Sequence, residues 1–165
     1  MSFPTKRDPA IERMRPLRAL CGSTDRELAR VDRLTYELEA PAGAVLIKEG
    51  DSPGGFFLVL SGRAEVSVAG VRCGEVGPGM FFGETAMLDR GPEPATVTAL
   101  TPTVLRVATR REFRELAEIG PVAHTMLLTL VTRQRLALGN EICRLAVNSM
   151  TTEEPSASRV PAISG

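Results

Sequence analysis

Eight short apolar runs occupy residues 36–107 and constrain the fold more than any other feature of the sequence. Breaks rich in glycine, proline or serine separate them, a pattern typical of β-strands. Since no long helical pattern lies between them, the runs predict an eight-stranded antiparallel β-roll, or jelly roll. The predicted strands are Tyr36–Glu39, Val45–Lys48, Phe56–Leu60, Ala64–Val68, Val71–Val76, Met80–Phe82, Thr96–Leu100 and Val104–Val107. The continuously apolar third run is expected to be a central strand.

Helical patterns flank the predicted roll. Before it, Thr24 and Glu27 have the spacing of a capping box, in which each side chain bonds the other residue's backbone N–H. After it, helical spacing resumes at Arg110, breaks at Gly120-Pro121 and continues over residues 122–147. The predicted fold class is mainly β with flanking α, with one N-terminal helix and two C-terminal helices around the roll.

Apolar side chains recur at steps of three and four along residues 122–147, and predict a seam that faces either the sheet or a twin helix. With the polar Gln134 in the same series, they are Leu127, Val131, Leu138, Ile142 and Leu145. We expect a homodimer through this helix. On either side of a domain at 16–147 we expect a loose lead-in at 1–15 and a disordered tail at 148–165, because both segments are polar and contain proline.

Charge and residue usage exclude several function classes. The 20 basic and 20 acidic side chains cancel, which argues against a general binder of nucleic acid or membrane surfaces. The single histidine, His124, argues against a histidine-rich metal site and a Ser-His or Cys-His nucleophile, so we predict no metal and no enzyme. Three scattered cysteines favour reduced thiols in a cytoplasmic protein, and no apolar run approaches the length of a membrane span.

The stretch from Gly79 to Val97 carries the strongest functional signal. An apolar strand runs into Gly83-Glu84, followed by a short helical turn and a loop rich in proline and glycine. Consecutive backbone N–H groups at such a turn form a concave anion site, to which the positive end of the helix adds. The stretch predicts a cradle for a phosphate-bearing ligand, with Glu84 placed to accept a hydrogen bond from a hydroxyl. The alternative is a plain strand-loop-strand connection whose glycines only form the turn.

Two stretches together resemble the cyclic nucleotide-binding domain family. This family includes the sensor half of catabolite-activator-type regulators and the regulatory modules of cyclic-nucleotide-dependent kinases and channels. One stretch runs from Leu46–Asp51 through Leu58–Gly62, and the other is Phe82–Met87 with Ala95–Val97. The resemblance covers residues 17–147 and implies a non-enzymatic sensor of intracellular signalling.

The resemblance also implies a ligand, cyclic AMP or cyclic GMP, and a set of residues around it. In the family, the glutamate binds the ribose 2′-hydroxyl, neighbouring backbone N–H groups hold the cyclic phosphate, and polar groups of the last helix meet the base. Glu84 takes the first role here, and Arg135 and Asn140 lie near the positions for the last. The implied ligand-binding residues are Gly83, Glu84, Thr85, Ala86, Glu93, Pro94, Ala95, Arg135 and Asn140.

One departure from the family pattern stands out. Where the family has a phosphate-binding arginine and a small residue, this chain has Glu93 and Pro94. The lost charge-assisted bond, the added repulsion and the missing proline N–H together cost about 4 kcal/mol, or about a thousandfold in affinity. Arg90, in the same loop, either compensates by reaching into the site or is solvated. An uncharged or cationic ligand becomes more reasonable than in the family.

Two functions remain open. The first is a sensor whose C-terminal helices shift position when a cyclic nucleotide binds, and the intact Gly83-Glu84 pair favours it. The second is a degenerate domain that acts as a dimerisation or protein-interaction module, which Glu93 and Pro94 favour. Either function requires an unknown protein partner. We expect no DNA binding, because no helix-turn-helix follows the last predicted helix.

Overall fold

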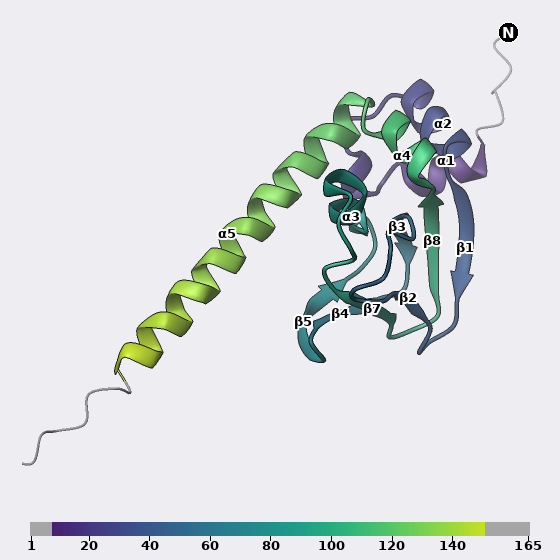
Figure 1. Ribbon diagram of the computed structural model, residues 1–165. Helices are drawn as coiled ribbons and strands as arrows, with labels where there is room; N and C mark the ends of the chain where they lie inside the picture. The colour runs from purple at the N-terminus through teal and green to yellow at the C-terminus, as the bar shows by residue number, and fades with distance from the viewer. Residues whose placement is uncertain (1–7, 151–165) are drawn as a thin grey trace, which may run out of the picture. The chain divides into compact units, whose positions relative to one another are not determined.

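The computed structural model describes residues 8–150, and the side chains of residues 8–139. The chain divides into two compact units, and the boundary between Met126 and Leu127 falls inside the last helix, α5 (Gly120–Met150). The first unit contains all eight strands of the described residues together with helices α1 to α4 (Figure 1).

The described strands form two four-stranded antiparallel sheets, which confirms the predicted β-roll with flanking helices (Figure 1). In spatial order, the first sheet contains β1 (Tyr36–Ala40), β8 (Thr103–Ala108), β3 (Phe56–Ser61) and β6 (Phe81–Phe82). The second contains β2 (Val45–Ile47), β7 (Thr96–Ala99), β4 (Ala64–Val68) and β5 (Val71–Val76). Each strand boundary lies within one residue of the predicted one.

Strand β3 is buried on both faces, which explains its uninterrupted apolar sequence. Phe56 and Leu58 belong to the apolar cluster under the helices. Phe57 and Val59 belong to the second cluster, between the two sheets. Because β3 lies between β8 and β6, its predicted central position is confirmed.

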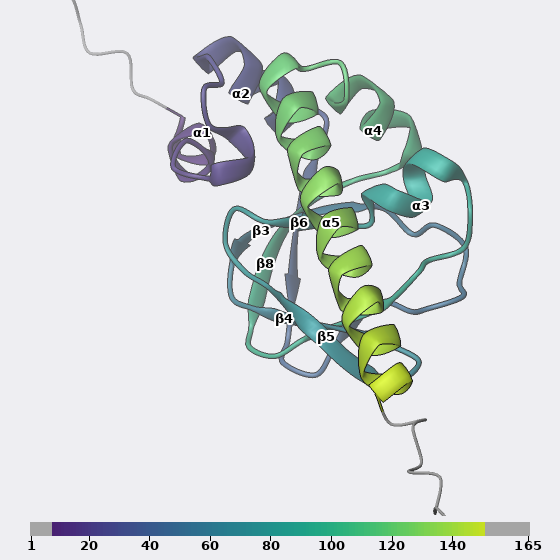
Figure 2. The ribbon, with the colours of Figure 1, turned by 90° about the vertical axis from the view of Figure 1, so that its left-hand side faces the viewer.

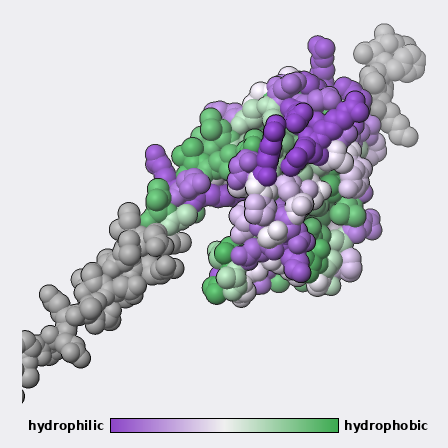
Figure 3. All heavy atoms as spheres, viewed as in Figure 1, coloured by the Kyte–Doolittle hydropathy of each residue, from purple (hydrophilic) through white to green (hydrophobic). Residues whose placement is uncertain are grey.

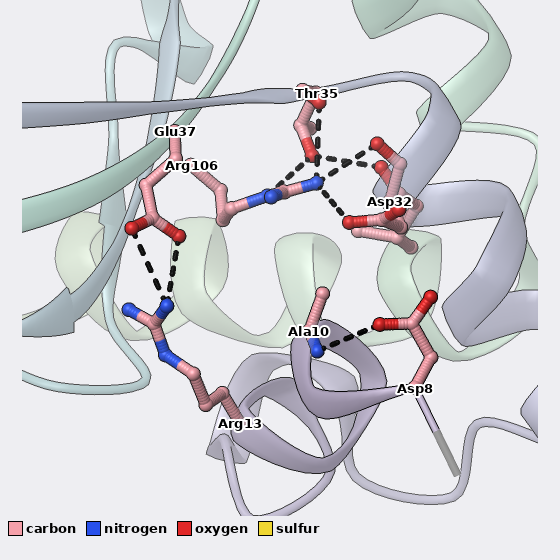
Figure 4. A network of polar contacts seen from close by, with 8 residues as sticks. Asp8, Ala10, Arg13, Asp32, Thr35, Glu37 and Arg106 are labelled. Carbon is pink, nitrogen blue, oxygen red and sulfur yellow. Dashed lines mark hydrogen bonds and ion pairs between the residues drawn. The ribbon is translucent and has the colours of Figure 1, made fainter. Parts of the chain in front are cut away.

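The described part of the predicted loose lead-in contains a helix instead. Helix α1 (Pro9–Met14) begins after Asp8, whose carboxylate accepts a 2.9 Å hydrogen bond from the N–H of Ala10 (Figure 4). Pro9 occupies the first turn, where its missing N–H costs nothing. The last residue, Met14, is only 1% exposed, and its burial in the core stabilises a helix that the polar sequence before it does not predict.

Helix α2 (Asp25–Arg33) follows a short 3-10 turn, η1 (Arg18–Leu20), and begins with the predicted capping box. The Glu27 carboxylate accepts a 2.7 Å hydrogen bond from the N–H of Thr24, and the Thr24 hydroxyl accepts one from the N–H of Glu27. Figures 1 and 2 both show α1, α2 and α4 (Arg110–Leu116) gathered at one end of the roll.

A buried arginine joins the end of α2 to the first sheet (Figure 4). Arg106 on β8 is 7% exposed and forms an ion pair with Asp32. Its Nη2 also donates to the backbone carbonyls of Asp32, at 2.8 Å, and Thr35, at 3.2 Å, while Nε donates to Thr35 Oγ1 at 2.8 Å. These bonds satisfy a charge whose burial would otherwise be unfavourable.

The predicted helix break at Gly120-Pro121 is confirmed, because α4 ends before it and α5 begins at it. Helix α5 runs to Met150, past the predicted start of the tail at residue 148. The rest of that predicted tail, residues 151–165, lies outside the described residues. Among the described helices, none combines the length and the apolar character that a membrane span requires.

Candidate functional site

The turn from β6 into α3 (Glu84–Asp89) depends on a glycine. Gly83 has a φ of 84°, in the left-handed region that residues with a Cβ rarely adopt. A Cβ added there would lie 2.2 Å from the backbone oxygen of Gly55, at the start of β3. Only glycine allows the two backbone segments to approach so closely, so this position is constrained by sterics as well as by φ.

Most of the first residues of helix α3 are buried. Glu84 is 1% exposed and Ala86 is fully buried at 0%, whereas Thr85 is half-buried. The Glu84 side chain is thus held inside the roll, at the turn that Gly83 forms. Burying a carboxylate is unfavourable unless polar groups surround it, so this placement is unusual for an ordinary turn.

The loop after α3 is bonded to the loop between β2 and β3. Glu93 is the centre of this contact: its carbonyl accepts a 2.9 Å bond from the N–H of Gly50, and its N–H donates at 2.8 Å to the carbonyl of Asp51. Thr96, the residue after Ala95, adds another bond to the same loop, since its Oγ1 accepts a 3.0 Å hydrogen bond from the N–H of Glu49. The two stretches that carry the family resemblance therefore meet in space.

The Glu93 carboxylate is held in an environment that disfavours its charge. The residue is 3% exposed, and its Oε1 accepts one hydrogen bond, at 3.3 Å, from the N–H of Gly54. Burial raises the pKa of Glu93, the Gly54 hydrogen bond opposes that rise, and the charges of Glu84 and Asp89 add to it. Several carboxylates thus lie within electrostatic reach of one another where a phosphate is expected. The charges of these neighbouring carboxylates disfavour ionisation of the Glu93 carboxyl.

The structure brings seven of the nine predicted site residues into one region of the first unit. These are Gly83, Glu84, Thr85, Ala86, Glu93, Pro94 and Ala95. Pro94 is exposed and Ala95 is half-buried. The other two lie on the part of α5 that belongs to the second unit: Arg135 is exposed there, and the side chain of Asn140 lies outside the described residues.

Arg90 ends α3 in a left-handed conformation, with a φ of 61°. Its side chain lines a groove of about 270 Å³ between α3 and α4, called the α3–α4 groove below, together with Arg110 and Arg114. No hydrogen bond or ion pair within the described residues joins Arg90 to Glu93. Sequence reasoning did not single out the two α4 arginines, although their spacing of four residues places them on one helix face.

Comparisons with known proteins agree with this geometry. A family model described as the cyclic nucleotide-binding domain matches residues 37–119, which are 83 of the 165 residues. A cAMP-dependent protein kinase regulatory subunit of Yarrowia lipolytica is 37% identical over 98 residues, covering 59% of this chain and 26% of that protein. The chain therefore spans about a quarter of the length of that curated relative.

Two solved structures share the fold. The catabolite activator protein of Thermus thermophilus has a TM-score of 0.68 at 26% identity, covering 78% of this chain and 62% of that one. The regulatory subunit of a cAMP-independent protein kinase A from Trypanosoma brucei has a TM-score of 0.66 at 23% identity, covering 73% and 46%, which is a likeness of fold alone. With the roll, the Gly83 turn and the matched family model all in agreement, the chain belongs to the cyclic nucleotide-binding domain family.

Proposed function

We propose that the chain is a non-enzymatic regulatory module of intracellular signalling whose site binds the phosphate of a cyclic nucleotide only weakly. The observation that carries the proposal is the buried Glu93 carboxylate, which lies within electrostatic reach of Glu84. A cyclic phosphate entering beside it meets negative charge where its relatives offer a cation. The Gly83 turn and the buried Glu84 preserve the ribose side of the same site.

The expected weakening follows from close charges. Replacing a charge-assisted bond to phosphate with repulsion costs about 4 kcal/mol, which lowers affinity about a thousandfold. This loss includes the N–H that Pro94 lacks. A ligand that keeps the ribose hydroxyl but lacks the phosphate charge avoids both penalties, so we favour an uncharged or cationic occupant of this site.

Titration with fluorescently labelled cyclic AMP and cyclic GMP tests the proposal directly. The natural chain should bind both weakly, and Glu93→Arg with Pro94→Ala should strengthen binding by up to about a thousandfold. Glu39→Arg is the matched control, because it makes the same change in net charge at an exposed position on β1. Low-micromolar binding by the natural chain, or equal affinities of the natural chain and the double variant, would contradict the proposal.

The second candidate is a dimerisation module that has lost its ligand. Several apolar side chains of α5 favour it, because they are largely exposed within the described residues. These are Leu127 at 61%, Leu128 at 54%, Val131 at 45%, Leu136 at 64% and Leu138 at 62%. Sedimentation of the chain with and without Leu127→Gln and Leu138→Gln tests this role. A dimer that dissociates in the variant supports it, and a monomeric natural chain contradicts it.

A further inference from the structure

The α3–α4 groove combines a basic rim with an apolar floor. Its floor contains Met87 and Phe113, which are 7% and 3% exposed, and the more exposed Leu88. Its rim carries the three exposed arginines 90, 110 and 114. Figure 3 shows strongly hydrophilic side chains gathered over α3 and α4 on this face of the molecule.

The arginines of this rim have no ion-pair partner within the described residues. Arg30 and Arg106 each form an ion pair with a carboxylate, at Glu118 and Asp32. In contrast, Arg90, Arg110 and Arg114 form no hydrogen bond or ion pair with another described side chain, and no acidic residue is among those that line the groove. Like charges gathered in one groove repel one another, so an anionic partner relieves a repulsion as well as adding attraction.

The position of Arg90 is a second, independent feature of the groove. Its φ of 61° is one that glycine adopts without strain and arginine does not. The residue that suits this conformation best, glycine, is present at the next position, Gly91, whereas the left-handed position itself is occupied by an arginine. Helices commonly end in this conformation, usually at a glycine, so the arginine here is kept at a small cost in backbone energy while its side chain lines the groove.

We propose that the α3–α4 groove binds an acidic peptide segment of a partner protein, in which carboxylates flank an apolar side chain. The guanidinium groups match carboxylates in geometry and charge. The floor at Met87, Leu88 and Phe113 accepts the apolar side chain, which a nucleic-acid backbone does not supply. The formal net charge of zero also provides no general field to attract nucleic acid. This surface does not depend on what the Glu93 site binds.

Fluorescence polarisation with the full chain tests the surface. The probe is a fluorescein-labelled peptide with a central leucine between pairs of aspartates. It should bind saturably, and binding should weaken as ionic strength rises, because exposed charges are screened. A peptide with asparagine in place of every aspartate should not bind, and one with serine in place of the leucine should bind more weakly.

Variants separate the groove from the rest of α4. Arg110→Gln with Arg114→Gln should weaken binding about tenfold, whereas Arg111→Gln should leave it unchanged, because Arg111 is exposed on the same helix but does not line the groove. Arg90→Gly should also weaken binding without lowering the thermal unfolding temperature, since glycine suits the left-handed backbone.

Three results would overturn the proposal. One is the absence of saturable binding by the aspartate peptide. Another is an equal loss of binding in Arg111→Gln and in the double variant. The third is tighter binding of a single-stranded oligothymidylate that depends on the same arginines, which would assign the groove to nucleic acid instead.

Discussion

Two buried charged side chains, Arg106 and Glu93, differ in how well the surrounding groups compensate their charge. Arg106 is surrounded by acceptors, with the Asp32 carboxylate, two backbone carbonyls and the Thr35 hydroxyl all bonded to its guanidinium. Glu93 is more deeply buried, but its carboxylate accepts one hydrogen bond from a described residue and lies near two further carboxylates. The first charge is compensated where it joins α2 to β8, and the second is not.

The difference indicates what each position is for. A charge that is fully compensated is tolerated in the folded state, because its bonds offset the cost of removing it from water, and removing one partner is strongly destabilising. A charge left under-compensated costs stability, and such costs are characteristic of positions that serve a ligand. This contrast supports our proposal that the loop around Glu93 serves a ligand rather than the fold.

The largest expected effect comes from breaking the Gly83 turn, which holds Glu84, one of the carboxylates near Glu93. Gly83→Ala should lower the free energy of unfolding by about 3–5 kcal/mol, because it combines a left-handed φ with a clash against the Gly55 carbonyl. Chemical denaturation measures the change. Gly50→Ala is the matched control: it has the same φ of 84° but nothing within 4 Å of the added Cβ, so it should cost only about 1–2 kcal/mol. Equal losses would show that the close approach is unimportant.

A smaller loss is expected at the compensated charge. Arg106→Met should lower the free energy of unfolding by about 2–4 kcal/mol, because Asp32 and the end of α2 lose their partner. For comparison, Arg72→Met removes two ion pairs at the surface, with Glu65, at 3.4 Å, and with Glu75, and should cost less than about 1 kcal/mol. If the two variants were equally stable, the Arg106 bonds would not be the connection that holds α2 to the sheet.

The smallest effect has the opposite sign. Glu93→Gln should raise the free energy of unfolding at pH 7 by about 1 kcal/mol, because a neutral amide replaces a buried charge. The pKa of Glu93 is raised above its usual 4.5 in the folded state, so the natural chain loses stability relative to this variant as pH rises from 4.5 through the raised value. Denaturation at several pH values measures this difference.

Glu27 provides the control of opposite sign. The Thr24 backbone and hydroxyl lower the pKa of Glu27 below 4.5, so its contribution is present above that pH and is lost as pH falls through the lowered value. The natural chain should therefore gain stability relative to Glu27→Gln as pH rises from the lowered pKa of Glu27 to 4.5. A pH dependence of the same sign in both variants would contradict the assignment of the Glu93 environment.

Much of the fold can be predicted from the sequence because its signals are local. Strand boundaries follow turn residues, and the α2 capping box needs only Thr24 and Glu27. Helix α1 could not be predicted in this way, because it depends on the burial of Met14 against residues distant in the sequence. The same reason hides the α3–α4 groove, in which Arg90 meets arginines that follow it by 20 residues or more.

The candidate site divides along the same line. The resemblance to the family identifies Gly83 from the sequence, and it also shows that Glu93 stands where the family has an arginine. The close approach of Gly83 to the Gly55 carbonyl and the proximity of Glu84 to Glu93 are visible only once the loops are placed together. The ligand-binding roles of these residues, and those expected of Arg135 and Asn140, stay predictions.

The Gly83 turn lies against Gly55, the residue just before β3. The Gly55 carbonyl touches that turn, and the ring of the next residue, Phe56, lies 5.3 Å from the ring of Phe113 on α4. The turn and α4 therefore contact two adjacent residues of the chain, Gly55 and Phe56. We therefore expect an occupant that displaces the Gly83 turn to disturb the contact of Phe56 with Phe113 on α4 as well.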